Sequence, residues 1–368
     1  MEKVSAFLRR KDIVFSPKRY FIDAMSAMAQ GLFCTLLVGT ILNTLGTQLH
    51  IGFLTDIIVT LGKGDGAVGY TIGGLCSAMV GPGMAVAIGQ ALNAPPMVLF
   101  SLIPVGFATN AMGGAGGPLA VLFVAIIAAE IGKAVSKETK IDILVTPIVT
   151  ILSGIGAAAL IAAPIGTAAS AVGKAIMWAT ELQPFFMGII VSVVIGIALT
   201  LPISSAAICA ALGLTGLAGG AAVAGCCAQM VGFAVMSFRE NRWGGLAAQG
   251  LGTSMLQMGN IVRNPRIWIP PTLTSAITGP IATCIFRMEM NGAAVSSGMG
   301  TCGLVGQIGV YTGWLADMEA GTKAAITATD WLGLVLICFV LPAILSWLIA
   351  LPLRSWGWIG ENDLKLDL

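Results

Sequence analysis

Residues 257–311 read QMGNIVRNPRIWIPPTLTSAITGPIATCIFRMEMNGAAVSSGMGTCGLVGQIGVY, and this stretch decides how the chain folds. Most of it is apolar enough to lie in a membrane, yet it contains Arg263, Arg266, Arg287 and Glu289 and is interrupted by prolines and glycines. Charges and broken backbone are tolerated at membrane depth only where they face protein or a water-filled cavity. The stretch therefore predicts the wall of a polar site inside a bundle of helices.

The composition of the whole chain indicates an integral membrane protein. Of its 368 residues, 57% are hydrophobic and only 10% are charged, whereas soluble domains average about 25% charged residues. Apolar segments of roughly 20 residues recur, for example from Phe21 and from Trp331, and this length crosses a bilayer core. We predict an all-α polytopic membrane protein with about ten transmembrane helices and additional re-entrant hairpins.

Basic residues crowd the start of the chain, ahead of the first apolar segment: Lys3, Arg9, Arg10, Lys11, Lys18 and Arg19. By the positive-inside rule, this predicts a cytoplasmic N-terminus. The mixture of basic and apolar residues over positions 1–20 predicts a short amphipathic helix on the inner membrane surface. A topology signal is favoured over an arm that binds nucleic acid, so no nucleic-acid partner is expected.

Neither a metal nor another cofactor is expected from the cysteine and histidine pattern. The eight cysteines lie in apolar or glycine-rich surroundings, none forms a C-x-x-C pair, and His50 is the only histidine. A metal site of the Cys/His type needs a cluster of ligands that this pattern does not supply. The cysteines are predicted to be small packing residues.

Shifts in glycine, proline and charge content divide the chain into five predicted segments. Residues 1–20 form the amphipathic segment, 21–201 a scaffold-like half, 202–321 a glycine-rich half with re-entrant hairpins, 322–353 the last transmembrane helix and 354–368 a polar tail.

Two further features are expected inside these halves. In the scaffold-like half, residues 166–183 predict an interfacial helix between two spans. In the glycine-rich half, LTGLAGG at 214–220 predicts a break between two half-helices. Transporters use such breaks to place unpaired backbone groups at the substrate site.

Six polar residues of the glycine-rich half are the candidates for substrate binding: Asn264, Arg266, Arg287, Glu289, Asn291 and Gln307. Arg287 and Glu289 either end a crossing at the interface, or lie deeper and need a partner or ligand. Asn264 and Arg266, with Arg263, either contact lipid phosphates or form a gate beside the substrate. Neutral amides suit a polyhydroxylated ligand, while a carboxylate at membrane depth would equally serve proton coupling.

FSPKRYFIDAMSAMAQGLF at 15–33 and RNPRIWIPPTLTSAITGPIAT at 263–283 carry a resemblance that extends over nearly the whole chain. The sequence resembles the membrane component, enzyme IIC, of the bacterial sugar phosphotransferase system, and more closely the stand-alone IIC-like proteins of the PfoR family. The resemblance implies a dimeric permease of the bacterial inner membrane. It also implies a scaffold set of helices and a transport set that carries sugar by an elevator-like movement.

The sequence departs from some IIC proteins at one informative place. Those proteins have an Asn-Glu-Pro near a hairpin end, where the Glu contacts the sugar hydroxyl that is phosphorylated. Here Asn264 is followed directly by Pro265, so the matching carboxylate is missing. No fused domain with a phosphorylatable Cys or His is evident, so separate phosphotransferase proteins are the expected partners of any phosphorylation.

These observations predict a homodimeric inner-membrane permease for a carbohydrate or a similar polar small molecule. Two alternatives from other functional classes stay open. One is a membrane sensor or regulator that binds without transport. The other is an ion-coupled carrier of a non-sugar metabolite that uses Glu289.

Overall fold

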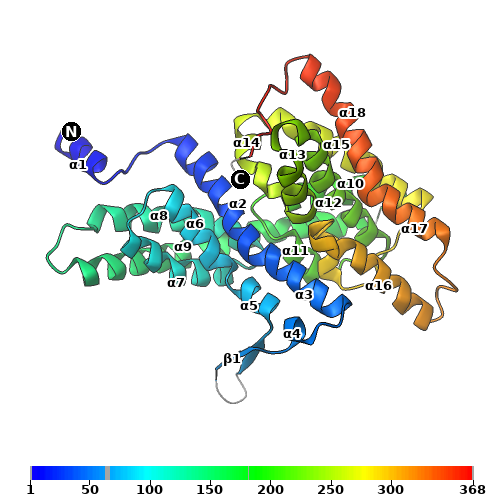
Figure 1. Cartoon of the computed structure of the whole chain (residues 1–368), viewed down its shortest axis with the longest axis horizontal. Coiled ribbons are helices and arrows are strands. Elements are labelled where there is room, and N and C mark those ends of the chain that lie inside the picture. The colour runs from blue at the N-terminus through cyan, green and yellow to red at the C-terminus, as the bar shows by residue number, and fades with distance from the viewer. Residues whose placement is uncertain (1, 63–66, 181, 367–368) are drawn as a thin grey trace. The chain divides into compact units, whose positions relative to one another are not determined.

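The computed structural model describes residues 2–62, 67–180 and 182–366, which are almost entirely helical (Figure 1). Within these residues the only sheet is an antiparallel pair of short strands, β1 (Val59–Leu61) and β2 (Val68–Tyr70). The all-α prediction is confirmed. By its internal contacts the chain divides into two compact units, unit 1 (Met1–Thr167) and unit 2 (Ala168–Leu368).

Five helical stretches of the described residues are long and apolar enough to cross a membrane, which confirms a polytopic membrane protein. They are Arg19–Thr47, Pro96–Val135, Asp142–Ala171, Gly216–Met236 and Ala328–Ser355. A pair of helices bent by 52°, Ile72–Ala78 and Val80–Ala91, makes a sixth if it counts as one broken span. A shorter apolar helix, Pro184–Thr200, has 17 residues.

Unit 1 begins with helix α1 (Glu2–Arg10) and a first span that is helical without interruption. That span comprises η1 (Arg19–Asp23), α2 (Ala24–Leu32), η2 (Phe33–Leu37) and α3 (Val38–Gln48). The short α4 (Gly52–Thr55) and the β1–β2 hairpin follow.

Helices α5 (Ile72–Ala78), α6 (Val80–Ala91), α7 (Pro96–Gly113) and α8 (Gly117–Val135) follow and pack against one another. The chain reverses at η4 (Gly114–Gly116), where Gly114 has a φ of +51°. A Cβ on Gly113 would lie 3.2 Å from the Cβ of Ala120, so α7 and α8 lie side by side. The apolar stretch from Pro96 to Val135 is therefore a helical hairpin and not one straight span.

Helix α9 (Asp142–Thr180) runs for 39 residues and leads from unit 1 into unit 2. The predicted interfacial helix at 166–183 is therefore not a separate element, since its described residues continue the preceding span to Thr180. Pro164 lies inside α9 without ending it. Helices near a membrane tolerate such a proline because the freed backbone groups find other partners.

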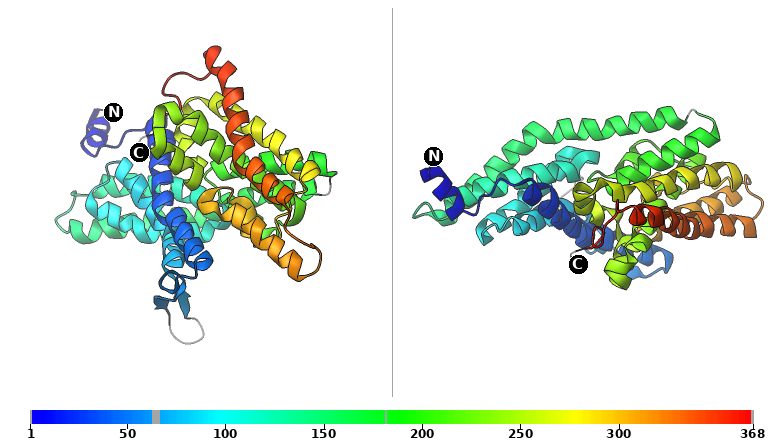
Figure 2. Two further views of the ribbon diagram at one scale, coloured as in Figure 1. Left: turned by 45° about the vertical axis from the view of Figure 1, so that its right-hand side comes forward. Right: turned by 90° about the horizontal axis from the view of Figure 1, so that it is seen from above.

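Helix α12 (Gly216–Met236) is the centre of unit 2 and is almost entirely buried. Around it pack α10 (Pro184–Thr200), α15 (Ile269–Pro280) and α18 (Leu341–Ser355) (Figure 1 and Figure 2). Close approach depends on glycine, because a Cβ on Gly225 would overlap the backbone of Ser192. Helix α10 is thus part of the compact core of unit 2, although the sequence placed it in the scaffold-like half.

The other elements of unit 2 are short helical pieces. They are α11 (Ser205–Ala211), α13 (Phe238–Ala247), η5 (Ala248–Gly252), η6 (Ser254–Gln257), α14 (Met258–Arg263), η7 (Pro265–Trp268), η8 (Ile281–Ile285), η9 (Ala294–Gly298), η10 (Cys302–Leu304), α16 (Val305–Glu319), α17 (Ala328–Val335) and η11 (Leu336–Val340). The predicted break near 214–220 is present between α11 and α12. Gly213 and Gly216 have φ values of +59° and +64° there, which glycine adopts at low cost.

Candidate functional site

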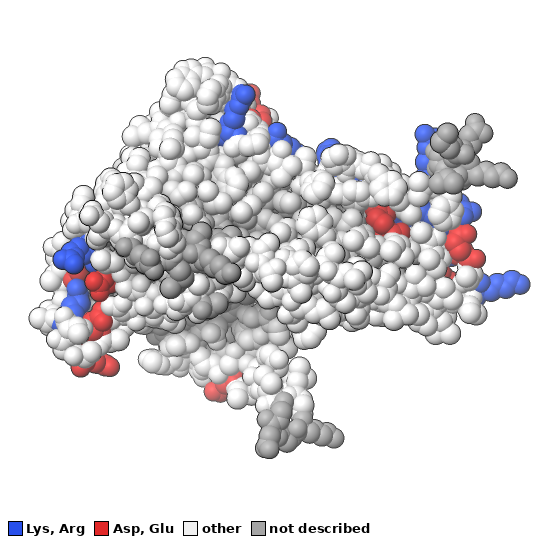
Figure 3. Space-filling model, turned by 180° about the vertical axis from the view of Figure 1, so that it is seen from behind, with Lys and Arg blue, Asp and Glu red and all other residues white. Residues whose placement is uncertain are grey.

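Charged side chains of unit 2 lie at the two ends of its helices. The segment α15–η8 leads from Arg266 to Arg287, and the last span leads from Asp330 to Arg354. The face shown in Figure 3 is largely uncharged, and most of its charged side chains lie near the margins. Arg263, Arg266 and Arg287 are exposed, whereas the fully buried polar side chains described in unit 2 are neutral.

The arginines therefore do not point into the core of unit 2, which was one of the positions that the sequence left open for them. The physical reason is the cost of desolvation, since an ionised group loses more by burial than a neutral amide or hydroxyl.

Three of the six candidate residues come together in a pocket of about 370 Å³. Arg287, Glu289 and Asn291 line one part of it. The rest is formed by α16, by the loop that follows it, and by the first turn of α17, through Trp314, Asp317, Thr322, Lys323 and Asp330. We call this the acidic-end pocket.

The segment 287–291 reaches the pocket because its side chains alternate between core and surface. Met288 and Met290 are buried in the core of unit 2, while Glu289 between them is only half-buried. Met290 and Gly216 exchange two backbone hydrogen bonds of 3.0 and 3.1 Å, so the segment is attached to the start of α12. This strand-like alternation turns the charged residues towards the pocket.

Asn291 joins the two halves of the acidic-end pocket. Its Nδ2 donates hydrogen bonds to Glu289 Oε2 at 3.2 Å and to Asp317 Oδ2 at 2.9 Å. Its Oδ1 accepts from the backbone N–H of Gly216 at 3.1 Å. One amide thus orients two carboxylates and ties them to the central helix.

The opposite wall is held by an ion pair and a helix cap. Lys323 Nζ lies 2.8 Å from Asp330 Oδ1, and Asp330 and Thr327 form a reciprocal capping box at the start of α17. Lys323 also lies over the ring of Trp314, 5.8 Å from its centroid.

Sequence reasoning did not select Asp317, Lys323 or Asp330 as site residues, because they occupy an ordinary charged loop in the sequence. The T-x-x-D capping pattern at 327–330 is the signal that would have drawn attention to Asp330.

Asn264 and Arg266 lie at the other end of unit 2 and hold the C-terminal tail. Asn264 Nδ2 donates to the carbonyl of Trp358 at 2.8 Å and to Asp363 Oδ2 at 2.7 Å. The guanidinium of Arg266 is 5.2 Å from the ring centroid of Trp358. The carboxylate that contacts Asn264 is therefore Asp363, from the tail.

A ladder of buried amides continues this attachment. Gln257 donates to Gln249 Oε1 at 2.8 Å and to the carbonyl of Leu364 at 2.9 Å. Asn260 donates to Gln257 Oε1 and to the carbonyl of Lys365, both at 2.8 Å. The polar tail predicted at 354–368 is thus fastened to unit 2 through its backbone carbonyls.

Gln307, the sixth candidate, is buried in α16 away from the acidic-end pocket. Its Nε2 donates to Cys227 Sγ at 3.2 Å. Its Oε1 has no hydrogen-bond partner among the residues that the structure describes. The structure therefore groups Arg287, Glu289 and Asn291, and separates them from Asn264, Arg266 and Gln307.

Unit 1 contains a cluster of charges that the sequence did not reveal. Lys133, whose side chain is only 1% exposed, donates to the carbonyls of Asp12 and Leu92 and lies 3.1 Å from Glu130. Arg19 pairs with Asp12 at 2.6 Å, and its hydrogen bond lowers the pKa of Asp12 to about 2. Lys133 and Arg19 also neutralise the partial negative charge at the C-terminal end of α6, since both donate to the carbonyl of Leu92. The role of the cluster is therefore structural.

The all-α fold with membrane-length helices defines a polytopic membrane protein, and unit 2 has a polar pocket at one end. The sequence matches the family described as "Phosphotransferase system, EIIC" over residues 22–366, and the chain belongs to this family. It is a component of a sugar transporter of the phosphotransferase type.

Neither the curated proteins nor the solved structures gave a significant match. The narrower assignment to the PfoR family stays a prediction.

Proposed function

We propose that the chain is a permease that binds a carbohydrate in the acidic-end pocket and carries it across the membrane. The observation that carries this proposal is the mixture of groups on the pocket wall. Arg287 and Lys323 are donors, and Glu289 and Asp317 are acceptors. Each sugar hydroxyl both donates and accepts hydrogen bonds, so it needs such a mixture. A volume of about 370 Å³ is within the range of small-molecule sites.

The charge distribution of unit 2 suggests the side on which the pocket opens. Six cations accompany three carboxylates at the arginine-rich end: Arg239, Arg242, Arg263, Arg266, Arg354 and Lys365 with Glu240, Glu361 and Asp363. At the pocket end, Arg287 and Lys323 accompany Glu289, Asp317, Glu319 and Asp330. The positive-inside rule then favours a cytoplasmic arginine-rich end. We infer that the pocket receives substrate from outside the cell membrane.

The family also bears on the partners of the protein. Phosphotransferase-type transport implies separate phosphotransferase proteins, and the resemblance implies a homodimer. Both are part of the proposal, together with an N-terminus in the cytoplasm of a bacterial cell.

Ligand-dependent thermal stability of the purified full chain tests the substrate class. A panel of sugars is compared with other polar metabolites, and at least one sugar is expected to raise the melting temperature. A response to another class of metabolite, with none to any sugar, would remove the carbohydrate part of the proposal.

Two matched substitutions test the site. Asp317→Asn removes a pocket carboxylate, and we expect sugar binding about 5- to 150-fold weaker, which corresponds to a charged hydrogen bond of about 1–3 kcal/mol. Glu319→Gln changes an exposed carboxylate of the same helix that does not line the pocket, so it serves as the control. Equal affinity in both variants would place the sugar elsewhere.

Vesicle uptake separates the permease from the two alternatives. A sensor would bind the sugar without moving it across the membrane. An ion-coupled carrier would accumulate substrate in response to a proton gradient and would lose this response after Glu289→Gln. The permease proposal expects uptake that an imposed pH gradient does not change.

A further inference from the structure

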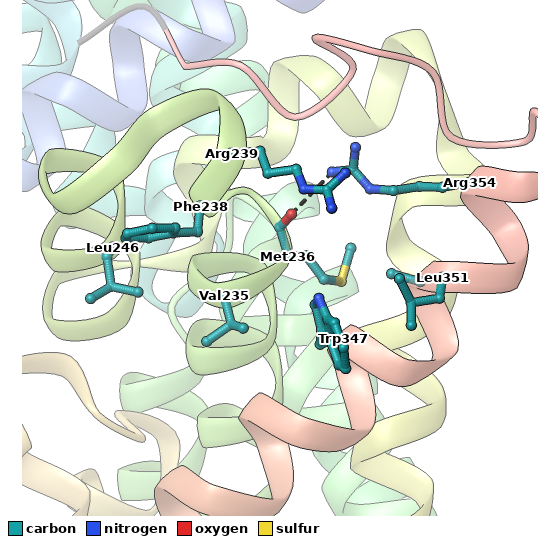
Figure 4. Close-up of a pocket in the computed structure, with 9 residues that line it drawn as sticks. Val235, Met236, Phe238, Arg239, Leu246, Trp347, Leu351 and Arg354 are labelled. Atoms are coloured by element: carbon teal, nitrogen blue, oxygen red, sulfur yellow. Dashed lines mark hydrogen bonds between the residues drawn. The ribbon is translucent and has the colours of Figure 1, made fainter.

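A second pocket, of about 250 Å³, lies at the arginine-rich end of unit 2 (Figure 4). We call it the arginine-end pocket. Its walls come from the last turn of α12, from α13 and from α18, and they are mainly apolar: Val235, Met236, Phe238, Leu246, Trp347, Ala350 and Leu351. Figure 4 shows the side chains of Arg239 and Arg354, which both line the pocket, at its rim.

The two arginines differ in how their charges are compensated. Arg354 donates to Glu240 Oε1 at 2.8 Å and to the carbonyl of Met236 at 3.0 Å. The side chain of Arg239 makes no hydrogen bond or ion pair with any residue that the structure describes, and it reaches the same rim. One positive charge is thus left without a protein partner, at an exposed position beside apolar walls. Its complement is a ligand with one negative charge attached to an apolar body.

The position of the pocket along the helices indicates what that ligand is. Both α12 and the last span are long enough to cross a membrane, and the pocket lies at their ends. Four exposed tryptophans belong to the same end, Trp243, Trp347, Trp356 and Trp358. Tryptophan is enriched at the level of lipid headgroups, so the rim lies where phosphates meet acyl chains. A free small anion has no apolar part, so it would make no favourable contact with the apolar walls below the rim.

We propose that the arginine-end pocket binds an anionic phospholipid, with its phosphate on Arg239 and part of an acyl chain against Trp347 and Leu351. The bound lipid contacts both α13 and α18, so it stabilises the ends of these helices against each other. Basic pockets between transmembrane helices recognise lipid headgroups in this way. The proposal concerns a site remote from the acidic-end pocket and does not depend on which substrate the protein carries.

Intact-complex mass spectrometry of the delipidated full chain provides the test. The probes are phosphatidylglycerol, phosphatidylcholine and glycerol 3-phosphate, which is the charged headgroup without acyl chains. We expect the protein to retain phosphatidylglycerol in preference to phosphatidylcholine, and we expect glycerol 3-phosphate not to displace it.

Three substitutions sharpen this test. Arg239→Gln is expected to weaken retention of phosphatidylglycerol about five-fold, since one basic residue near the surface contributes about that factor. Arg263→Gln, at an exposed arginine of the same end outside the pocket, should leave retention unchanged. Leu351→Trp crowds the apolar wall without altering charge and should also weaken retention. Arg354 is not a suitable position for a substitution in this test, because its ion pair with Glu240 supports the fold.

Several results would overturn the proposal. Equal retention of the two lipids would show that charge does not determine binding. Displacement by glycerol 3-phosphate would show that the acyl chain does not contribute to binding. An equal loss in Arg239→Gln and Arg263→Gln would show a general surface effect and not a site. Unchanged retention in either Arg239→Gln or Leu351→Trp would show that lipid does not occupy this pocket.

Discussion

Replacement of Gly220 by alanine tests the contact that positions the acidic-end pocket. Gly220 lies in α12 directly against the backbone of Met288. A Cβ at this position would lie well inside 3.0 Å of the Met288 carbonyl oxygen, a distance that real Cβ atoms essentially never show. Backbone cannot rotate away as a flexible side chain can. The segment that carries Glu289 must therefore shift, by on the order of 1 Å.

The expected magnitude combines two opposing effects. Alanine stabilises a helix relative to glycine by about 0.5–1 kcal/mol. Overpacking of a filled core costs about 1–3 kcal/mol, so the net effect of Gly220→Ala is destabilising. Gly244→Ala in α13 is the matched control, because a Cβ there would meet nothing within 4 Å. Gly244→Ala should retain only the stabilisation that alanine gives a helix relative to glycine. The two variants should therefore change the free energy of unfolding in opposite directions.

Apparent melting temperatures of the purified full chain, followed by tryptophan fluorescence, measure this difference. About 2–4 °C is expected for each kcal/mol in a unit of this size. Sugar affinity should fall in Gly220→Ala, since Glu289 moves with Met288, and should stay unchanged in Gly244→Ala. The reasoning is refuted if Gly220→Ala melts at or above the wild-type temperature and binds sugar as tightly.

Two further substitutions and one truncation test the supports of the two units. Asp12→Asn should lower stability at pH 6 by about 1 kcal/mol, because the Arg19 ion pair is partly exposed to solvent. Since the folded pKa of Asp12 is lowered from 3.8 to about 2, this contribution is present above pH 4, and the difference between variant and wild type should vanish as the pH falls to about 2. Thr327→Ala removes the capping box with Asp330 and should cost about 1 kcal/mol in thermal melts. Truncation after Ser355 strips the amide ladder of its carbonyl partners and should cost about 2–4 kcal/mol.

A specific result would contradict each of these predictions. For Asp12→Asn, a stability difference that persists undiminished below pH 2 would exclude the ion pair as its source. For Thr327→Ala, the control is Thr329→Ala on the exposed side of the same turn, and equal effects would exclude the cap. For the truncation, an unchanged melting temperature would show that the tail does not support unit 2.

The sequence alone determined the class of the protein. A charged content of 10% and recurrent apolar segments leave only a membrane bundle, because such a surface is not stable in water. The break near 214–220 was also predictable, since glycine at Gly213 and Gly216 permits a positive φ that other residues resist. These are local properties, and each depends on residues that are close together in the chain.

Only the tertiary structure decided which polar residues share a site. Asn291 donates hydrogen bonds to both Glu289 and Asp317. Neither the hydrophobic periodicity of the sequence nor its charge pattern links these residues. Asn264 looked equivalent in sequence, yet it binds the tail at the other end of the unit. The physical reason is that hydropathy reports whether a residue is buried, whereas a site depends on which helix ends are brought together by packing. In unit 2 that packing depends on glycine contacts between residues far apart in the chain, such as Gly220 with Met288.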